Sequence, residues 1–112
     1  MKKTVDKVWG KEEILVNTRQ YCSKFLHLNK GFQCSLHYHK LKDETFYILS
    51  GRVSMEVGGR TITMLPDMSV DVPHGAMHRF TGLEDSVILE TSTQDFVSDS
   101  YRIENSREAS HE

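Results

Sequence analysis

Residues 31–51 read Gly31-Phe-Gln-Cys-Ser-Leu-His37-Tyr-His39-Lys-Leu-Lys-Asp-Glu44-Thr-Phe-Tyr-Ile-Leu-Ser-Gly51, and the rest of the 112-residue chain is organised around them. In a β-strand, residues two apart point to the same face, about 6–7 Å apart, so His37 and His39 can converge on one ion. Glu44 follows a short polar break and opens an apolar run, which places its carboxylate at the start of the next antiparallel strand. There it can meet both imidazoles across a hairpin, and the three residues begin a candidate metal site.

A fourth ligand has to come from a distant part of the chain, and His78 is the candidate. It lies in the stretch Val72-Pro73-His74-Gly75-Ala76-Met77-His78-Arg79-Phe80. Isolated histidines such as His27 and His74 are usually polar residues whose hydrogen bonds are satisfied by neighbours. We therefore expect neither of those two to bind metal.

Residues 31–51 resemble the first sequence motif of the cupin superfamily, Gly-x5-His-x-His-x4-Glu-x6-Gly, at every defined position. Residues 67–82 are similar to the second motif, Gly-x5-Pro-x-Gly-x2-His-x3-Asn. Its Pro-x-Gly-x2-His centre is intact, whereas Asp67 and Gly82 depart from the outer glycine and asparagine. The resemblance covers about residues 10–95 and implies a double-stranded β-helix, that is, a jelly-roll barrel of antiparallel strands.

The resemblance also implies one divalent transition metal bound by four side chains: His37, His39, Glu44 and His78. Three imidazoles and one carboxylate suit manganese, iron(II), cobalt, nickel or zinc better than calcium or magnesium. Four protein ligands leave one or two positions of an octahedral ion open, which favours catalysis or ligand capture over a closed structural site.

The strand pattern alone indicates an all-β fold. Turn signals separate eight or nine short segments, none has helical periodicity, and such a pattern is typical of an antiparallel sandwich or small barrel. The expected strands cover residues 13–16, 21–28, 32–39, 45–50, 53–57, 60–65, 69–72, 78–81 and 87–93. We expect a single domain over residues 1–112, with a core of about 10–95, an N-terminal arm (1–12) and a polar C-terminal tail (96–112).

Composition restricts the partners. A hydrophobic fraction of 38% and a charged fraction of 27% are ordinary for a soluble globular protein. The net charge of −2 at pH 7 predicts no basic patch and no nucleic-acid partner. No apolar run approaches the roughly 20 residues of a membrane span, and the N-terminus lacks the apolar core of a signal peptide. We expect a cytoplasmic protein with no membrane partner, in which Cys22 and Cys34 are free thiols.

The strand over residues 21–28 raises the question of a buried cation. Lys24 shares a face with Leu26 and Leu28, so if the leucines point into the barrel, Lys24 does too. Lysine is rarely buried without a partner. Either its ammonium meets an anionic or oxygen-rich substrate, or it reaches water at the barrel mouth along its own stem.

A closer resemblance indicates the type of reaction. Five segments in order are similar to the cupin domain of type II mannose-6-phosphate isomerases: Trp9-Gly10, Tyr21 to Gly31, Ser35 to His39, Val72 to Arg79 and Leu89-Glu90. That family usually has glutamine where this chain has His37. The segment Lys40 to Glu44 is more similar to metal-dependent sugar isomerases of the lyxose isomerase kind. The resemblance implies an isomerase or epimerase of a sugar or sugar phosphate.

Such a reaction needs a base that moves a proton and groups that hold the sugar. Glu44 is a candidate base besides being a ligand, and Glu90 is a second carboxylate if its strand faces it inward. Lys42 is the third candidate catalytic residue. Lys24 and Arg79 are candidates for binding substrate hydroxyl or phosphate groups. The alternative for Lys42 and Arg79 is that both are charges at the barrel rim, in surface ion pairs worth little.

Two other classes of function stay open, an iron(II)-dependent dioxygenase and a non-catalytic module that binds a sugar or small acid. The oligomeric state is inferred from one outer face. Phe25 and His27 would leave an apolar, partly polar surface. Trp9-Gly10 is expected to dock the N-terminal arm on the barrel or on a partner subunit, and Val8-Trp9 suits contact with a second copy. The expected assembly is a homodimer, with a small molecule as substrate.

Overall fold

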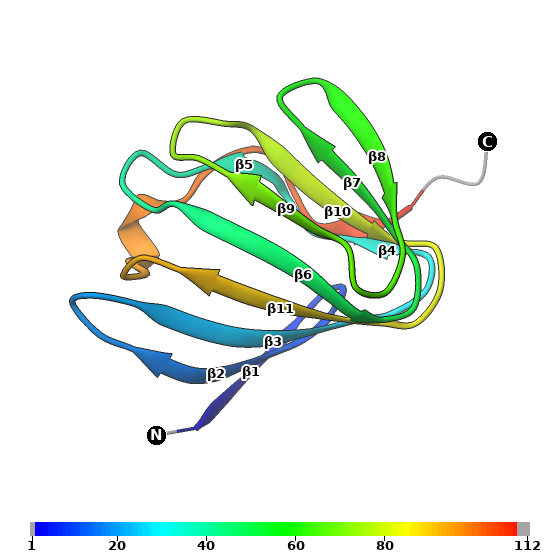
Figure 1. The fold of residues 1–112 in the computed structure, drawn as a ribbon. Helices are drawn as coiled ribbons and strands as arrows, with labels where there is room; N and C mark the ends of the chain where they lie inside the picture. Colours follow the sequence, from blue (N-terminus) through cyan, green and yellow to red (C-terminus); the bar gives the residue numbers. More distant parts are fainter. Residues whose placement is uncertain (1, 110–112) are drawn as a thin grey trace.

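The computed structural model describes residues 2–109, which form β-strands almost throughout (Figure 1). In chain order the elements are β1 (Lys3–Lys7), β2 (Gly10–Asn17), β3 (Cys22–Leu28), β4 (Phe32–Gln33), β5 (Leu36–Tyr38), β6 (Glu44–Ser50), β7 (Val53–Val57), β8 (Arg60–Met64), β9 (Ser69–Val72), β10 (His78–Gly82), β11 (Ser86–Ser92), the short 3₁₀-helix η1 (Val97–Asp99), β12 (Tyr101–Glu104) and β13 (Arg107–Glu108). The prediction of an all-β fold is confirmed.

The strands form two facing antiparallel sheets, which enclose the core as the walls of a jelly-roll barrel (Figure 1). One sheet has the order β1-β2-β3-β11-β6-β9, and the other has β12-β5-β10-β4-β13, with β7 and β8 added beside β10. Some neighbours, such as β1 and β2, follow one another in the sequence, whereas others, such as β3 and β11, come from distant parts of it. In β3, alternate residues are buried, so that Lys24 faces inward with Leu26 and Leu28, as the pattern predicted.

The N-terminal arm docks on its own barrel. Trp9 is buried, with its ring edge-on to Phe80 at 5.1 Å between centroids. Gly10 has φ +147°, and a Cβ there would lie 1.9 Å from the carbonyl oxygen of His27, so only glycine fits. Strand β1 then folds back on β2. Trp9 is therefore unavailable for contact with a second copy, whereas Val8 remains exposed.

The C-terminal segment also builds the barrel. After η1, strand β12 pairs with β5, and β13 pairs with β4. Figure 1 shows η1 at the end of the barrel where the β5–β6 loop lies. The sequence pattern predicted only a polar tail over residues 96–112 and no role for it. This C-terminal segment, residues 95–108, contributes to the candidate metal centre.

Two further expectations concern the cysteines and the membrane. Cys22 and Cys34 are both buried and are free thiols in the structure. Within residues 2–109, no helix is long and apolar enough to cross a membrane.

Candidate metal centre

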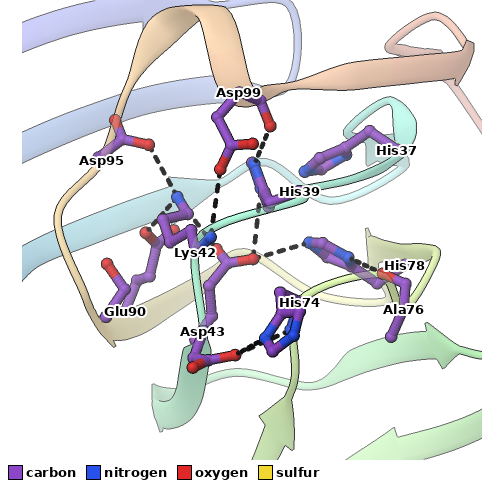
Figure 2. Close-up of polar contacts among 12 residues, drawn as sticks. His37, His39, Lys42, Asp43, His74, Ala76, His78, Glu90, Asp95 and Asp99 are labelled. Carbon is purple, nitrogen blue, oxygen red and sulfur yellow. Dashed lines mark hydrogen bonds and ion pairs between the residues drawn. The ribbon is translucent and has the colours of Figure 1, made fainter.

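Three histidines meet at one end of the barrel. His37 lies on β5 opposite His78 on β10, and His39 follows β5 in the loop toward β6. One ring nitrogen from each histidine lies within 4.8 Å of the others. Figure 2 shows the three rings turned toward a common centre. The structure thus brings together the histidines that the two motifs single out.

In each of the three rings, Nδ1 is hydrogen-bonded to a backbone carbonyl oxygen. Nδ1 of His37 lies 2.8 Å from the oxygen of Ser35, and Nδ1 of His39 lies 2.9 Å from that of Asp99. Nδ1 of His78 lies 3.0 Å from the oxygen of Ala76. Carbonyl oxygens only accept, so each Nδ1 donates its proton and each Nε2 keeps a lone pair. This tautomer is the metal-binding form.

Burial keeps the rings of His37 and His39 neutral. It lowers the pKa of His37 to about 3, assisted by the neighbouring His78. Burial also lowers the pKa of His39, although Glu44 opposes that shift. Neutral imidazole is the form that binds a metal ion.

Glu44 lies against the histidines at the start of β6. Its Oε1 is 3.1 Å from Nε2 of His78 and 3.3 Å from Nε2 of His39. Burial opposes its ionisation, but the positive charge of Lys42 favours the carboxylate and lowers the pKa of Glu44.

Three buried atoms at this centre have no hydrogen-bond partner within residues 2–109: His39 Nε2, His78 Nε2 and Glu44 Oε1. Unpaired buried polar atoms are costly, and lone pairs that face one another repel. A cation among them removes both penalties. The donor set, with nitrogen and carboxylate oxygen together, fits a divalent transition metal.

Lys42 is buried beside this centre, so the alternative of a rim charge is wrong. Its ammonium lies 3.3 Å from Oε2 of Glu44, 3.2 Å from Oε2 of Glu90 and 2.9 Å from Oδ1 of Asp95. The Lys42 side chain is only 4% exposed. Burial would lower its pKa, but Glu90 and Glu44 outweigh burial and raise it.

Glu90 faces inward from β11, which was the condition for a catalytic role. Burial raises its pKa, and the charge of Glu44 acts in the same direction. The Lys24 ammonium lies 3.2 Å from Glu12 and 3.0 Å from Asp95. Burial opposes the charge of Lys24, but the carboxylates outweigh it and raise the pKa. Two lysines and four carboxylates thus form one buried ion network: Lys24, Lys42, Glu12, Glu44, Glu90 and Asp95. Lys24 belongs to this network and does not reach water at the mouth of the barrel.

Arg79 lies elsewhere. Its Nε donates to the carbonyl of Cys34 at 2.9 Å, and its other nitrogens donate to Glu104 at 2.8 Å and to the carbonyl of Asn105 at 3.3 Å. It is not among the residues that line the cavity described below. This placement favours a structural role, in which Arg79 anchors the C-terminal segment, over the predicted contact with substrate.

Two residues of the C-terminal segment at the site were not predicted. Asp95 binds both buried lysines, and its pKa falls to about 2 because Lys42 and Lys24 outweigh burial, which acts to raise it. Asp99 is buried and binds the loop between β5 and β6.

A partly open cavity of about 400 Å³ lies beside this centre. The candidate ligands His37, His39 and Glu44 share its wall with the buried ion network and with apolar residues such as Phe46. This volume suits a small molecule. A more open depression of about 590 Å³ near Asp71 contains none of the three histidines, so the cavity of about 400 Å³ is the candidate binding site.

Comparison with protein families gives one match. Residues 24–91, more than half of the chain, match the family model described as the cupin domain, Cupin_2. Polyketide synthase CurC from Streptomyces cyaneus is 29% identical over 58 residues, which cover 52% of this chain and 38% of that protein. The chain thus matches less than half the length of this curated relative.

Several solved structures share the fold. KdgF from Halomonas sp. has a TM-score of 0.79 at 20% identity, over 86% of this chain and 89% of that one. Streptomyces Pac13 with uridine has a TM-score of 0.80 at 11% identity, over 93% and 85%. An RmlC-like cupin from Shewanella frigidimarina has a TM-score of 0.79 at 16% identity, over 88% of both chains. At these identities the likeness establishes the fold alone.

Proposed function

The chain belongs to the cupin family, and from that premise we propose that it is a metal-dependent isomerase or epimerase of a small sugar or sugar derivative. One observation carries the proposal. The Lys42 ammonium lies between Glu44, a candidate ligand, and Glu90, a buried carboxylate with a raised pKa. Paired carboxylates in unlike environments are the arrangement that general acid–base chemistry needs.

The proposed ligands are His37, His39, Glu44 and His78. A bound divalent transition metal supplies Lewis acidity, which acidifies the carbon next to a substrate carbonyl. Manganese, iron(II), cobalt, nickel and zinc all suit these donors.

Glu90 is the proposed proton carrier. Because burial raises its pKa, the Glu90 carboxylate is a stronger base than an exposed one, and it can take a proton from a substrate carbon and return it to the neighbouring carbon, while the hydroxyl proton moves to the former carbonyl oxygen. Lys42 holds Glu90 Oε2 in place and stabilises its charged form. Glu44 is the alternative base. The net change is an isomerisation, which needs no oxidant or reductant.

Charge at the opening of the cavity favours an anionic substrate. The buried lysines are neutralised by carboxylates, whereas Lys3, Lys7 and Arg102 also line the cavity and lie nearer the solvent. Lys3 and Arg102 have no ion-pair partner in the described part of the chain, and Lys7 has one only at 3.8 Å. We propose that these three cations, in place of Lys24 and Arg79, hold the phosphate or carboxylate of a sugar derivative.

The comparisons support the class of substrate only broadly. Pac13 is described as a nucleoside dehydratase and was solved with uridine, an oxygen-rich small molecule. CurC is named as a polyketide synthase component. Neither name specifies a sugar isomerase, so the proposal rests on the residues of the site.

We expect that Glu90→Gln lowers turnover by about 10²–10⁴-fold, the usual contribution of a general acid or base. The assay follows deuterium exchange from solvent into aldoses, uronic acids and their phosphates by NMR, without oxygen and with manganese present. Metal affinity should stay within a few-fold of wild type, because Glu90 is not a proposed ligand. Glu12→Gln, which alters another carboxylate of the same cavity, is the matched control.

Other outcomes would replace the proposal. Oxygen uptake that requires ferrous iron would identify a dioxygenase. Thermal stabilisation by a sugar acid, with no exchange and no turnover, would identify a binding module. Exchange that survives Glu90→Gln at the wild-type rate would exclude Glu90 as the base and leave Glu44.

We also propose a homodimer formed through the outer face of β3, where Phe25 and His27 are partly exposed. Light scattering should then give a mass about twice the 12.9 kDa of one chain. Phe25→Glu, which places a charge in this face, should shift the mass to that of a monomer. A wild-type mass of one chain at all concentrations argues against the dimer.

A further inference from the structure

Asp99 connects the C-terminal segment to the candidate metal centre through both its side chain and its backbone. Its carboxylate accepts hydrogen bonds from three consecutive backbone N–H groups, those of Lys40 at 2.9 Å, Leu41 at 3.1 Å and Lys42 at 3.1 Å. Its carbonyl oxygen accepts from Nδ1 of His39 at 2.9 Å. Figure 2 shows its contacts with His39 and Lys42. Asp99 is 3% exposed.

These hydrogen bonds fix a loop whose backbone is not paired in any strand. Residues 40–42 lie between β5 and β6, so their N–H groups have no ladder partner. A buried N–H without a partner is costly, and a carboxylate that gathers three of them makes charge-assisted bonds. His39 directly precedes this loop, and Lys42 is its last residue. One side chain therefore fixes the backbone on which a candidate ligand and the central ammonium both depend.

We propose that Asp99 is a positioning residue, which sets the orientation of His39 and Lys42 and so completes the metal centre from the C-terminal segment. The inference rests on the metal centre of the proposed function. Asp99 does not face the ion. It acts by fixing the His39 tautomer through its carbonyl and the loop geometry through its carboxylate.

The rest of the segment is anchored independently. Asn17 exchanges two hydrogen bonds with the backbone of Asp95, each of 3.0 Å. Tyr101 stacks on Tyr38 with centroids 5.2 Å apart. Removing the Asp99 carboxylate should therefore free the loop without detaching the segment, which allows the two effects to be separated.

The test compares Asp99→Ala and Asp99→Asn with Glu104→Gln. Glu104 anchors the same segment through Arg79 but contacts neither His39 nor residues 40–42. Calorimetry with manganese and with cobalt gives the affinity, and the absorption spectrum of bound cobalt reports ligand geometry. Loss of a group that hydrogen-bonds to a metal ligand typically lowers metal affinity about 10–100-fold. We expect Asp99→Ala to lower the affinity by that factor and to change the cobalt spectrum.

Asp99→Asn should be intermediate, because its one amide oxygen still accepts from part of the loop, whereas the NH2 group that replaces the second oxygen cannot accept. Glu104→Gln should leave affinity and spectrum unchanged. Hydrogen exchange of the amides of residues 40–42 should accelerate in Asp99→Ala without metal.

A lower melting temperature in Asp99→Ala with wild-type affinity and spectrum would reduce Asp99 to a purely structural residue and overturn the inference, while the proposed function stands. If the wild type binds neither metal, the metal centre itself fails, and the inference fails with it.

Discussion

His78→Ala should abolish tight binding of a divalent transition metal. His78 is 1% exposed, and its Nε2 faces Glu44 Oε1 at 3.1 Å with no hydrogen bond within residues 2–109. Loss of a direct ligand should cost more than the about 10–100-fold that loss of an outer hydrogen bond costs. Metal content by mass spectrometry, on protein purified without chelators, should fall from about one ion per chain to a trace, and His37→Ala should behave alike.

His74→Ala is the matched control for this loss. His74 lies four residues away, is exposed and binds the carboxylate of Asp43. The His74→Ala protein should retain the wild-type metal content. His27→Ala should do the same, because His27 lies on the outer face of β3. Circular dichroism must show that His78→Ala is folded. A folded His78→Ala protein that keeps a full complement of metal would contradict the assigned ligands.

The meeting of His37, His39 and Glu44 could be predicted because their pattern is local, whereas His78 was chosen from the resemblance of residues 67–82 to the second cupin motif. His37 and His39 are two residues apart on one strand and its extension, and Glu44 opens the next strand, so the period of a β-strand already brings them together. The same rule predicted that Lys24 faces inward with Leu26. Local periodicity thus determined which side chains enter the barrel.

The alternation of side chains along a strand also predicts the direction of Arg79. It directly follows His78 on β10, and neighbouring residues of a strand face opposite sides. Since His78 points to the centre, Arg79 had to point away from it, and its bonds to Cys34 and Glu104 lie there. The sequence alone argued against its contact with substrate.

Asp95 and Asp99 could not be found in this way. Their partners are more than 50 residues earlier in the chain, since Asp95 binds Lys42 and Asp99 binds residues 40–42. Periodicity states which face a residue occupies but not which distant loop returns beside it. The path of the C-terminal segment over the barrel end follows from tertiary packing.

The second large effect concerns Lys42. Lys42→Met keeps most of the side-chain volume but leaves Glu44, Glu90 and Asp95 without their shared cation. Breaking a buried ion pair from one side costs about 3–5 kcal/mol, so the metal-free protein should melt roughly 10–20 °C lower. Lys40→Met is the control. Lys40 is exposed, its ammonium lies 4.5 Å from the centre of the Tyr101 ring, and such a contact is worth about 0.5–1 kcal/mol.

Metal and pH should each reduce the difference between Lys42→Met and wild type. A cation bound at Glu44 replaces part of the lost charge, so metal should raise the melting temperature of the variant more than that of the wild type. The pKa of Asp95 is about 2 in the folded protein, below its ordinary value of 3.8, because Lys42 and Lys24 outweigh burial. That depression stabilises the wild type above about pH 4, and the contribution disappears as pH falls toward 2. The variant keeps the contribution of Lys24 but lacks that of Lys42, so the difference between the two melting temperatures should narrow on acidification. A constant difference from pH 7 to pH 3 would show that Lys42 contributes through packing and not through its charge.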